Sequence, residues 1–221
     1  MNVDYKDTFK YFSSIHPDIS KGTVLDYGSN SGTFLKSAGL KFAEGNYTGI
    51  DVDNSSVIVG QELFPTAKFI HYNTFNHMYN PQGIVNFSLP LAQTYDTIIS
   101  YSVFTHTTEE DMLSRIEELY NFLNVGGKLI FTYLNVGSTG TVKYFTDKRT
   151  KNFGYCDIIS TETKLYLVDA DIKQYPIEGK MLATFYNTAY LKSILWGYSV
   201  TSHQCPTGCY NCIQDCIVIN K

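Results

Sequence analysis

The sequence predicts an α/β fold, in which a mostly parallel β-sheet is covered by helices on both faces and ends in an antiparallel last strand. Between residues 23 and 134, five short apolar segments alternate with segments of helical spacing. Strands that alternate with helices in this way are typical of βαβ units and a parallel sheet. Two further strand-like segments, 198–204 and 214–221, lie close enough along the chain to pair antiparallel. Together these segments predict a sheet of seven strands.

The first third of the chain supplies three helices and three strands. Apolar side chains at helical spacing predict helices, and these cover 5–15, 32–43 and 54–64. Short apolar runs predict strands at 23–27, 47–52 and 67–72. Pro17 follows the first helix, and Asn54 is a candidate N-cap for the third.

The middle of the chain continues the alternation. The fourth strand, within 95–103, is a near-continuous apolar run, as expected for a strand that is covered on both faces. A helix over 108–123 follows, and Thr107 with Glu110 fits a capping box at its start. The fifth strand is predicted at 128–134. After residue 135 the alternation stops, and one strand-like piece, 163–170, stands alone before a helix over 187–198.

Composition and charge exclude several classes of partner. The chain is 43% hydrophobic and 17% charged, which is typical of a folded globular protein and not of a disordered one. Its formal net charge is −4 and it has no dense Lys/Arg run, so we do not expect it to bind nucleic acid. No apolar run is long enough to span a membrane, and the first residues lack the layout of a signal peptide. We therefore expect a cytoplasmic protein.

The segment TVLDYGSNSGTF, residues 23–34, is the most informative stretch for function. A glycine-rich turn between a first strand and a first helix lies at the carboxyl edge of the sheet, where backbone can approach a ligand closely. The second strand ends at Asp51, about twenty residues further on, where an acid can accept hydrogen bonds from a ribose diol. Both features suit a cofactor that contains adenosine.

Two details separate the candidate cofactors. A dinucleotide site requires G-x-G-x-x-G, whereas Gly28 and Gly32 are separated by Ser-Asn-Ser. Asp26 lies two residues before Gly28, and a carboxylate there would repel a pyrophosphate. The same carboxylate suits a cofactor that carries an ammonium and a sulfonium group. The loop therefore favours S-adenosyl-L-methionine (SAM), with S-adenosyl-L-homocysteine as the product, over a nicotinamide nucleotide.

Several segments resemble the motifs of the class I SAM-dependent methyltransferases, which have a Rossmann-like fold. These segments are VLDYGSNSG, YTGIDVD, AKFIHYNTF and the long stretch that begins YDTIISYSV. They resemble motif I, motif II, the third-strand segment, and motif IV with the helix and strand that follow it. The resemblance covers nearly all of residues 20–135 and 183–221, and the terminal strand pair also matches that fold.

The resemblance implies a cofactor site and its residues. The implied cofactor-binding residues are Asp26, Gly28, Ser29, Asn30, Gly32, Asp51, Val52, Asn73, Thr74 and Ser100. Asn30 stands in place of the middle glycine of motif I, and asparagine tolerates left-handed backbone angles better than most residues. Asn73 stands where the family often has an aspartate that contacts the adenine amine.

His106 is the candidate catalytic residue. Methyl transfer from a sulfonium is a direct displacement, and a hydroxyl acceptor must also lose its proton to a base near the methyl group. SYSVFTHTT follows the fourth strand, whose end points at the cofactor, and histidine is the side chain that titrates nearest neutral pH. We expect His106 to act as the base or to orient the substrate; the alternative is a histidine that packs or caps at a helix start.

The expected acceptor is a hydroxyl group of a small molecule or a sugar in a glycan. Enzymes that methylate amino groups of DNA bases carry an N/D-P-P-Y/F motif after the fourth strand, where this chain has SYSV. The stretch SVFTHTTEEDM resembles methyltransferases that act on small molecules, including sugar O-methyltransferases. Two alternatives stay open: a non-catalytic module that binds SAM or a nucleoside, and a methyltransferase that acts on a protein or an N-acceptor.

We expect the whole chain, 1–221, to form a single methyltransferase domain. Its parts are an N-terminal helix (1–19), a SAM-binding core (20–135), a substrate-cap insertion (136–182), and a C-terminal helix with a β-hairpin (183–221). The insertion is rich in tyrosine and phenylalanine, which suits sugars and flat molecules alike.

Four cysteines crowd into the C-terminal part: Cys205, Cys209, Cys212 and Cys216. The first three reproduce the C-x3-C-x2-C spacing of radical-SAM enzymes, but those enzymes have a barrel-like fold that motif I does not indicate. Four thiols this close can form a structural zinc site, whereas free thiols are the default in a cytosolic protein. We assign no metal ligand and keep zinc as the alternative.

Overall fold

The structure, a computed structural model, describes residues 8–76, 79–135, 156–160, 164–169, 181–204 and 214–221. Its strands are β1 (Val24–Tyr27), β2 (Tyr47–Asp51), β3 (Lys68–His71), β4 (Tyr95–Ser100), β5 (Leu123–Asn135), β6 (Cys156–Ser160), β7 (Lys164–Asp169), β8 (Met181–Tyr186), β9 (Ser199–His203) and β10 (Asp215–Asn220). Within the described residues these ten strands form one sheet in the order β3-β2-β1-β4-β5-β8-β7-β6, and β10 pairs with both β5 and β9.

The first five strands form the predicted parallel core. Parallel pairs join β1 to β2 and β4, β2 to β3, and β4 to β5. The pairs of β10 with β5 and with β9 are antiparallel. This arrangement confirms the prediction of a mostly parallel sheet with an antiparallel last strand. It also brings the carboxyl ends of β1, β2 and β4 to one edge.

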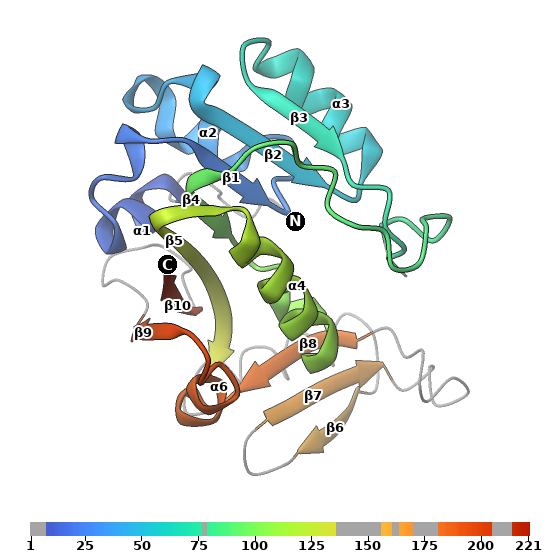
Figure 1. Cartoon of the computed structure of the whole chain (residues 1–221). Helices are drawn as coiled ribbons and strands as arrows, with labels where there is room; N and C mark the ends of the chain where they lie inside the picture. The colour runs from blue at the N-terminus through green and yellow to red at the C-terminus, as the bar shows by residue number, and fades with distance from the viewer. Residues whose placement is uncertain (1–7, 77–78, 136–155, 161–163, 170–180, 205–213) are drawn as a thin grey trace.

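Three strands extend the seven that the sequence predicts. The isolated strand-like piece at 163–170 is confirmed as β7, whereas β6 and β8 have no counterpart in the sequence prediction. β8 pairs with Leu134 and Asn135 at the end of β5, beyond the residues that pair with β4 and β10. Figure 1 shows β6–β8 at the end of the molecule opposite β3.

Helices cover both faces of the sheet (Figure 1), as predicted. The main helices in the described residues are α1 (Thr8–Ile15), α2 (Thr33–Ala38), α3 (Asn54–Leu63), α4 (Glu109–Asn121) and α6 (Thr188–Ile194). Helices α1, α2 and α3 pack into one hydrophobic core through Tyr11, Phe34 and Val57. Helices α4 and α6 pack into a second hydrophobic core, on the other face of the sheet, through Ile116 and Leu191. No helix in these parts of the chain is long and apolar enough to cross a membrane.

The helix caps lie one residue away from the predicted ones. Thr108 caps α4: its side chain accepts from the Asp111 N–H at 3.1 Å and donates to the Asp111 carboxylate at 2.6 Å. The capping box of α4 is therefore formed by Thr108 and Asp111 and not by the predicted Thr107 and Glu110. Likewise, α3 is capped by the aspartate that precedes the predicted Asn54.

Candidate active site

The loop between β1 and α2 turns through three left-handed residues. Gly28, Asn30 and Gly32 have φ angles of 81°, 50° and 81°. The Asn30 side chain accepts a hydrogen bond from the N–H of the next residue at 2.6 Å, a local bond that stabilises asparagine in this conformation. The N–H groups of Gly28 and Ser29 both donate to the Ile50 carbonyl, at 2.9 and 3.1 Å. The turn is therefore fixed to the end of β2.

Asp51 ties the end of β2 to this loop. Its Oδ2 accepts from the Asn30 N–H at 2.7 Å, and its Oδ1 accepts from the Asp53 N–H at 2.9 Å. Burial raises the pKa of Asp51, and these two backbone donors oppose the rise. Each carboxylate oxygen has a second lone pair, so the group can still accept hydrogen bonds from a diol. The structure thus brings Asp51 and Asn30 together, as the sequence predicts.

Asp26 lies beneath the loop and is only 4% exposed. Its Oδ2 accepts from the Tyr47 hydroxyl at 2.7 Å, whereas its Oδ1 bonds to no residue that the structure describes. Burial raises the pKa of Asp26 to about 7, the Tyr47 hydrogen bond lowers it, and the charge of Asp51 raises it further. A cation placed at Oδ1 would favour the charged carboxylate. The site can therefore bind a positive group and release a proton.

The residues after β2 and β3 lie beside Asp51. The Tyr72 N–H donates to the Asp51 carbonyl at 2.8 Å, so the chain leaves β3 next to the end of β2. The Asn80 side-chain amide then donates to the Asn73 side-chain oxygen at 3.1 Å and to the Thr74 carbonyl at 2.9 Å. These bonds anchor Asn73 and Thr74 at the same edge as the glycine loop.

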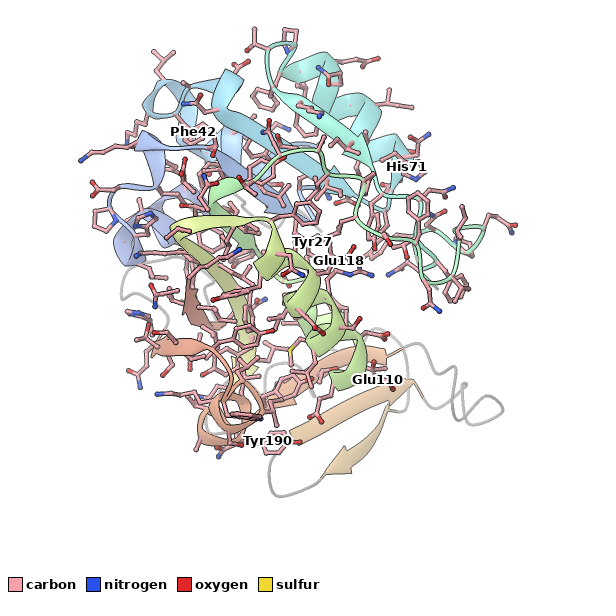
Figure 2. The ribbon with its side chains drawn as sticks, in the orientation of Figure 1. Tyr27, Phe42, His71, Glu110, Glu118 and Tyr190 are labelled. Atoms are coloured by element: carbon pink, nitrogen blue, oxygen red, sulfur yellow. The ribbon has the colours of Figure 1, made fainter. Side chains whose placement is uncertain are left out.

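Val52 follows Asp51 and is fixed from β3. The His71 ring nitrogen Nε2 lies 3.2 Å from the Val52 carbonyl oxygen. Figure 2 shows His71 at the end of β3, close to the loop that carries Asn73. Ser100 differs from the other predicted residues, because it is fully buried and its hydroxyl has no hydrogen-bond partner among the described residues. Ser100 is the last residue of β4, and its part in cofactor binding stays a prediction.

The loop after β4 lies directly on the glycine loop. An ideal Cβ at Gly28 would lie 2.2 Å from Cγ2 of Val103, so a side chain at Gly28 would collide with Val103. Phe104 stacks on Tyr27 with ring centroids 5.9 Å apart, and both belong to the core on the face of the sheet that α4 covers. Figure 2 shows Tyr27 beside Glu118 of α4. The short 3-10 helix η5 (Phe104–His106) follows, and it ends at His106, whose side chain is exposed. His106 thus lies three residues from the contact with Gly28.

Sequence reasoning missed Val103, Tyr27 and Phe104. Each is an apolar or aromatic residue in a segment rich in such residues, and the contact of Val103 with Gly28 joins positions far apart in the sequence. No periodicity or motif spacing marks these side chains. Only the fact that glycine is required at Gly28 hints that something lies close to its α-carbon.

Strand β8, which begins at the end of the predicted insertion, reaches the same loop. The Thr184 hydroxyl in β8 donates to the Thr107 carbonyl at 2.9 Å, next to His106. Most of the predicted cap, 136–182, lies outside the described residues, so its role over the acceptor stays a prediction. Cys205, Cys209 and Cys212 also lie outside them, whereas Cys216 is buried in β10. Among the described residues no group of His, Cys, Asp or Glu could hold a metal ion.

Comparisons with known proteins agree on one family. A family model described as a methyltransferase domain matches residues 1–198. An uncharacterised methyltransferase of Bacillus cytotoxicus is 28% identical over 133 residues, which are 59% of this chain and 57% of that relative. The chain therefore spans little more than half the length of the curated relative.

Solved structures share the fold at low sequence identity. A provisionally named O-methyltransferase of Nostoc punctiforme superimposes with a TM-score of 0.61 at 18% identity, over 98% of this chain and 56% of that chain. The glycopeptide N-methyltransferase MtfA superimposes with a TM-score of 0.59 at 11% identity, over 100% of this chain and 90% of that one. At such identities the likeness concerns the fold alone.

Proposed function

This chain belongs to the methyltransferase domain family of class I SAM-dependent enzymes, and we propose that it transfers a methyl group to a hydroxyl of a small molecule or sugar. The observation that carries the proposal is the contact between Val103 and Gly28. It joins the loop that would hold the cofactor to the loop that presents His106. An exposed imidazole therefore lies at the same edge of the sheet as Asp26 and Asp51.

The residues around the glycine loop fit SAM. The unbonded Oδ1 of the buried Asp26 is a carboxylate oxygen suited to the ammonium group of the cofactor. Asp51 would accept the ribose hydroxyls, and the left-handed turn lets the backbone approach the methionine part. We assign Val52, Asn73 and Thr74 to the adenine end. When bound, SAM supplies an electrophilic methyl group on a sulfonium.

His106 acts as the base in the proposed mechanism. His106 would take the proton of the acceptor hydroxyl while the acceptor oxygen receives the methyl group that bound SAM would supply, with S-adenosylhomocysteine as the product. The protein contributes chiefly by aligning acceptor, methyl and sulfur, which can supply much of the rate enhancement. His106 is exposed at the end of η5, just before α4, and we place the acceptor beside it.

Cofactor binding is tested first, by a thermal-shift comparison of SAM, S-adenosylhomocysteine, NAD and NADP. A ligand at a hundred times its Kd stabilises by about 2.7 kcal/mol, and each kcal/mol moves the Tm of a chain this size by roughly 2–4 °C. We expect shifts of roughly 5–10 °C with the first two ligands and none with the nicotinamides. A shift with nicotinamides alone would refute the proposal.

Acceptor class is tested next, by measuring S-adenosylhomocysteine release with panels of sugars, phenols, amines and peptides. Release with hydroxyl compounds and a singly methylated product in the mass spectrum support the proposal. Release with amines or peptides alone would assign an N-acceptor or protein substrate, and binding without release would indicate a non-catalytic module. The cytoplasmic location and the absence of a nucleic-acid partner stay predictions.

A further inference from the structure

We propose that Gln214 is a positioning residue for the loop after β4, and that it acts by holding Ser102 in a left-handed conformation. Gln214 immediately precedes β10 and lies 112 positions from Ser102 in the sequence. The inference rests on the proposed function, because it concerns the loop that we assign to methyl transfer. It adds a residue from the far end of the sequence to that loop.

A closed ring of three hydrogen bonds links Gln214 to the loop. The Gln214 amide donates from Nε2 to Ser102 Oγ at 2.9 Å, and the Ser102 N–H donates to Thr132 Oγ1 at 2.8 Å. Thr132 Oγ1 closes the ring by donating to Gln214 Oε1 at 2.5 Å. Thr132 is 0% exposed and Gln214 is 7% exposed, so water does not compete strongly for these bonds.

Neighbouring groups support both ends of the ring. The hydroxyl of Thr105, which is 1% exposed, donates to the Ser102 carbonyl at 3.0 Å. The Tyr11 hydroxyl on α1 donates to the Gln214 carbonyl at 2.9 Å. Polar groups of Ser102 are therefore engaged at its N–H, its carbonyl and its hydroxyl, and the backbone of Gln214 is fixed by a helix from the start of the chain.

Ser102 needs this support because its φ is 60°. Residues other than glycine enter this region at a cost in free energy, and such residues persist where the surrounding structure determines them. Ser102 lies between the end of β4 and Val103, and the Val103 side chain lies against Gly28. If Ser102 relaxed to a common conformation, Val103 would leave Gly28 and His106 would move. Gln214 therefore acts on the proposed site through Ser102.

The first test measures amide hydrogen exchange of peptides covering residues 101–107 in the ligand-free protein. We compare the parent chain, Gln214→Ala and the control Val24→Ala. Val24 is the first residue of β1 and belongs to the core that contains Tyr11, so its truncation opens a cavity away from the loop after β4. Loss of the amide should accelerate exchange in this loop at least about tenfold in Gln214→Ala, because opening becomes local there. The control should lose global stability without this local acceleration. Equal exchange in Gln214→Ala and the parent chain, or in Gln214→Ala and the control, would overturn the inference.

The second test asks whether the conformation of Ser102 is the cause. Glycine adopts positive φ freely, so Ser102→Gly in the Gln214→Ala background should restore the geometry without the ring. We expect Gln214→Ala to weaken S-adenosylhomocysteine binding at least about tenfold, and the double variant to recover most of that loss. A double variant as weak as Gln214→Ala would contradict the mechanism. If the parent chain binds no S-adenosylhomocysteine, the proposed function fails, and the exchange experiment still decides the role of Gln214.

Discussion

Replacing Asp26 with asparagine should stabilise the ligand-free protein and weaken its binding of SAM. Asp26 is buried, and its Oδ2 accepts from the Tyr47 hydroxyl. The oxygen of an asparagine side chain can keep this hydrogen bond, and the substitution removes a charge that is costly to bury. The same charge is the one that we assign to the ammonium group of SAM. Stability and binding should therefore change in opposite directions.

The magnitude follows from the pKa of Asp26, which burial raises from 3.8 to about 7. A group whose pKa is raised by folding contributes stability below its unfolded pKa, and this contribution is lost as the pH rises through the folded value. At 1.36 kcal/mol per pKa unit, the buried charge costs the folded chain about 4 kcal/mol above pH 7. About 3 kcal/mol of this cost develops between about pH 5 and about pH 8.

Thermal unfolding of both proteins at the two pH values checks this reasoning. Each kcal/mol moves the Tm by roughly 2–4 °C, so the advantage of Asp26→Asn should be roughly 5–10 °C larger at the higher pH. Asp18→Asn is the matched control, because Asp18 is exposed and pairs with Lys21 at the surface. An advantage of Asp26→Asn that does not change with pH would show that Asp26 does not titrate in the folded chain. Undiminished SAM binding would remove Asp26 from the cofactor site.

Three further predictions follow from the same geometry. His106→Ala should lower kcat by about 10²–10⁴-fold, and a loss below about tenfold in a turnover assay would exclude a role as base. Gly28→Ala should lose at least about 2 kcal/mol of stability in denaturant titrations, from the positive φ and the collision with Val103, and Val103→Ala should recover part of it. SAM binding should tighten between about pH 6 and about pH 8 with release of a proton, because a cation at Asp26 lowers its pKa from about 7. Calorimetry in two buffers of different ionisation enthalpy measures that proton, and no release would contradict the assignment.

Local patterns in the sequence predict the strands well and the ends of the helices less well. The near-continuous apolar run within 95–103 predicts a strand, and β4 occupies Tyr95–Ser100. α2, predicted to reach residue 43, ends at Ala38 because Gly39 adopts φ 53° and ψ −137°, which does not continue a helix. Before α4, two adjacent threonines could each serve as the N-cap, and in the structure the N-cap is Thr108. β6 and β8 were beyond reach of the sequence, because their pairing depends on β7 and on the end of β5.

The residues of the candidate site also fall into two groups, those that the sequence predicts and those that it does not. Asp26, Gly28 and Asp51 are predictable because a fixed topology places the ends of β1 and β2 together. Val103 and Gln214 are not predictable, because their roles depend on contacts between segments far apart in the sequence. Valine and glutamine are common residue types outside any motif here, so only their contacts in the folded chain reveal their roles.

Strand register explains why the polar residues gather at this edge. In β1, Val24 and Asp26 project to the same face, so that face is apolar at the start of the strand and polar at its carboxyl end. In β5, the buried Thr132 holds the equivalent place near the carboxyl end. A buried polar group is costly unless it is hydrogen-bonded, and here the partners are Tyr47 for Asp26 and Gln214 for Thr132. Both partners come from other strands or their approaches: the Tyr47 bond joins β2 to β1, and Gln214 joins the start of β10 to β5 and to the loop after β4. We therefore expect substitutions of these partners to impair the proposed site before they unfold the sheet.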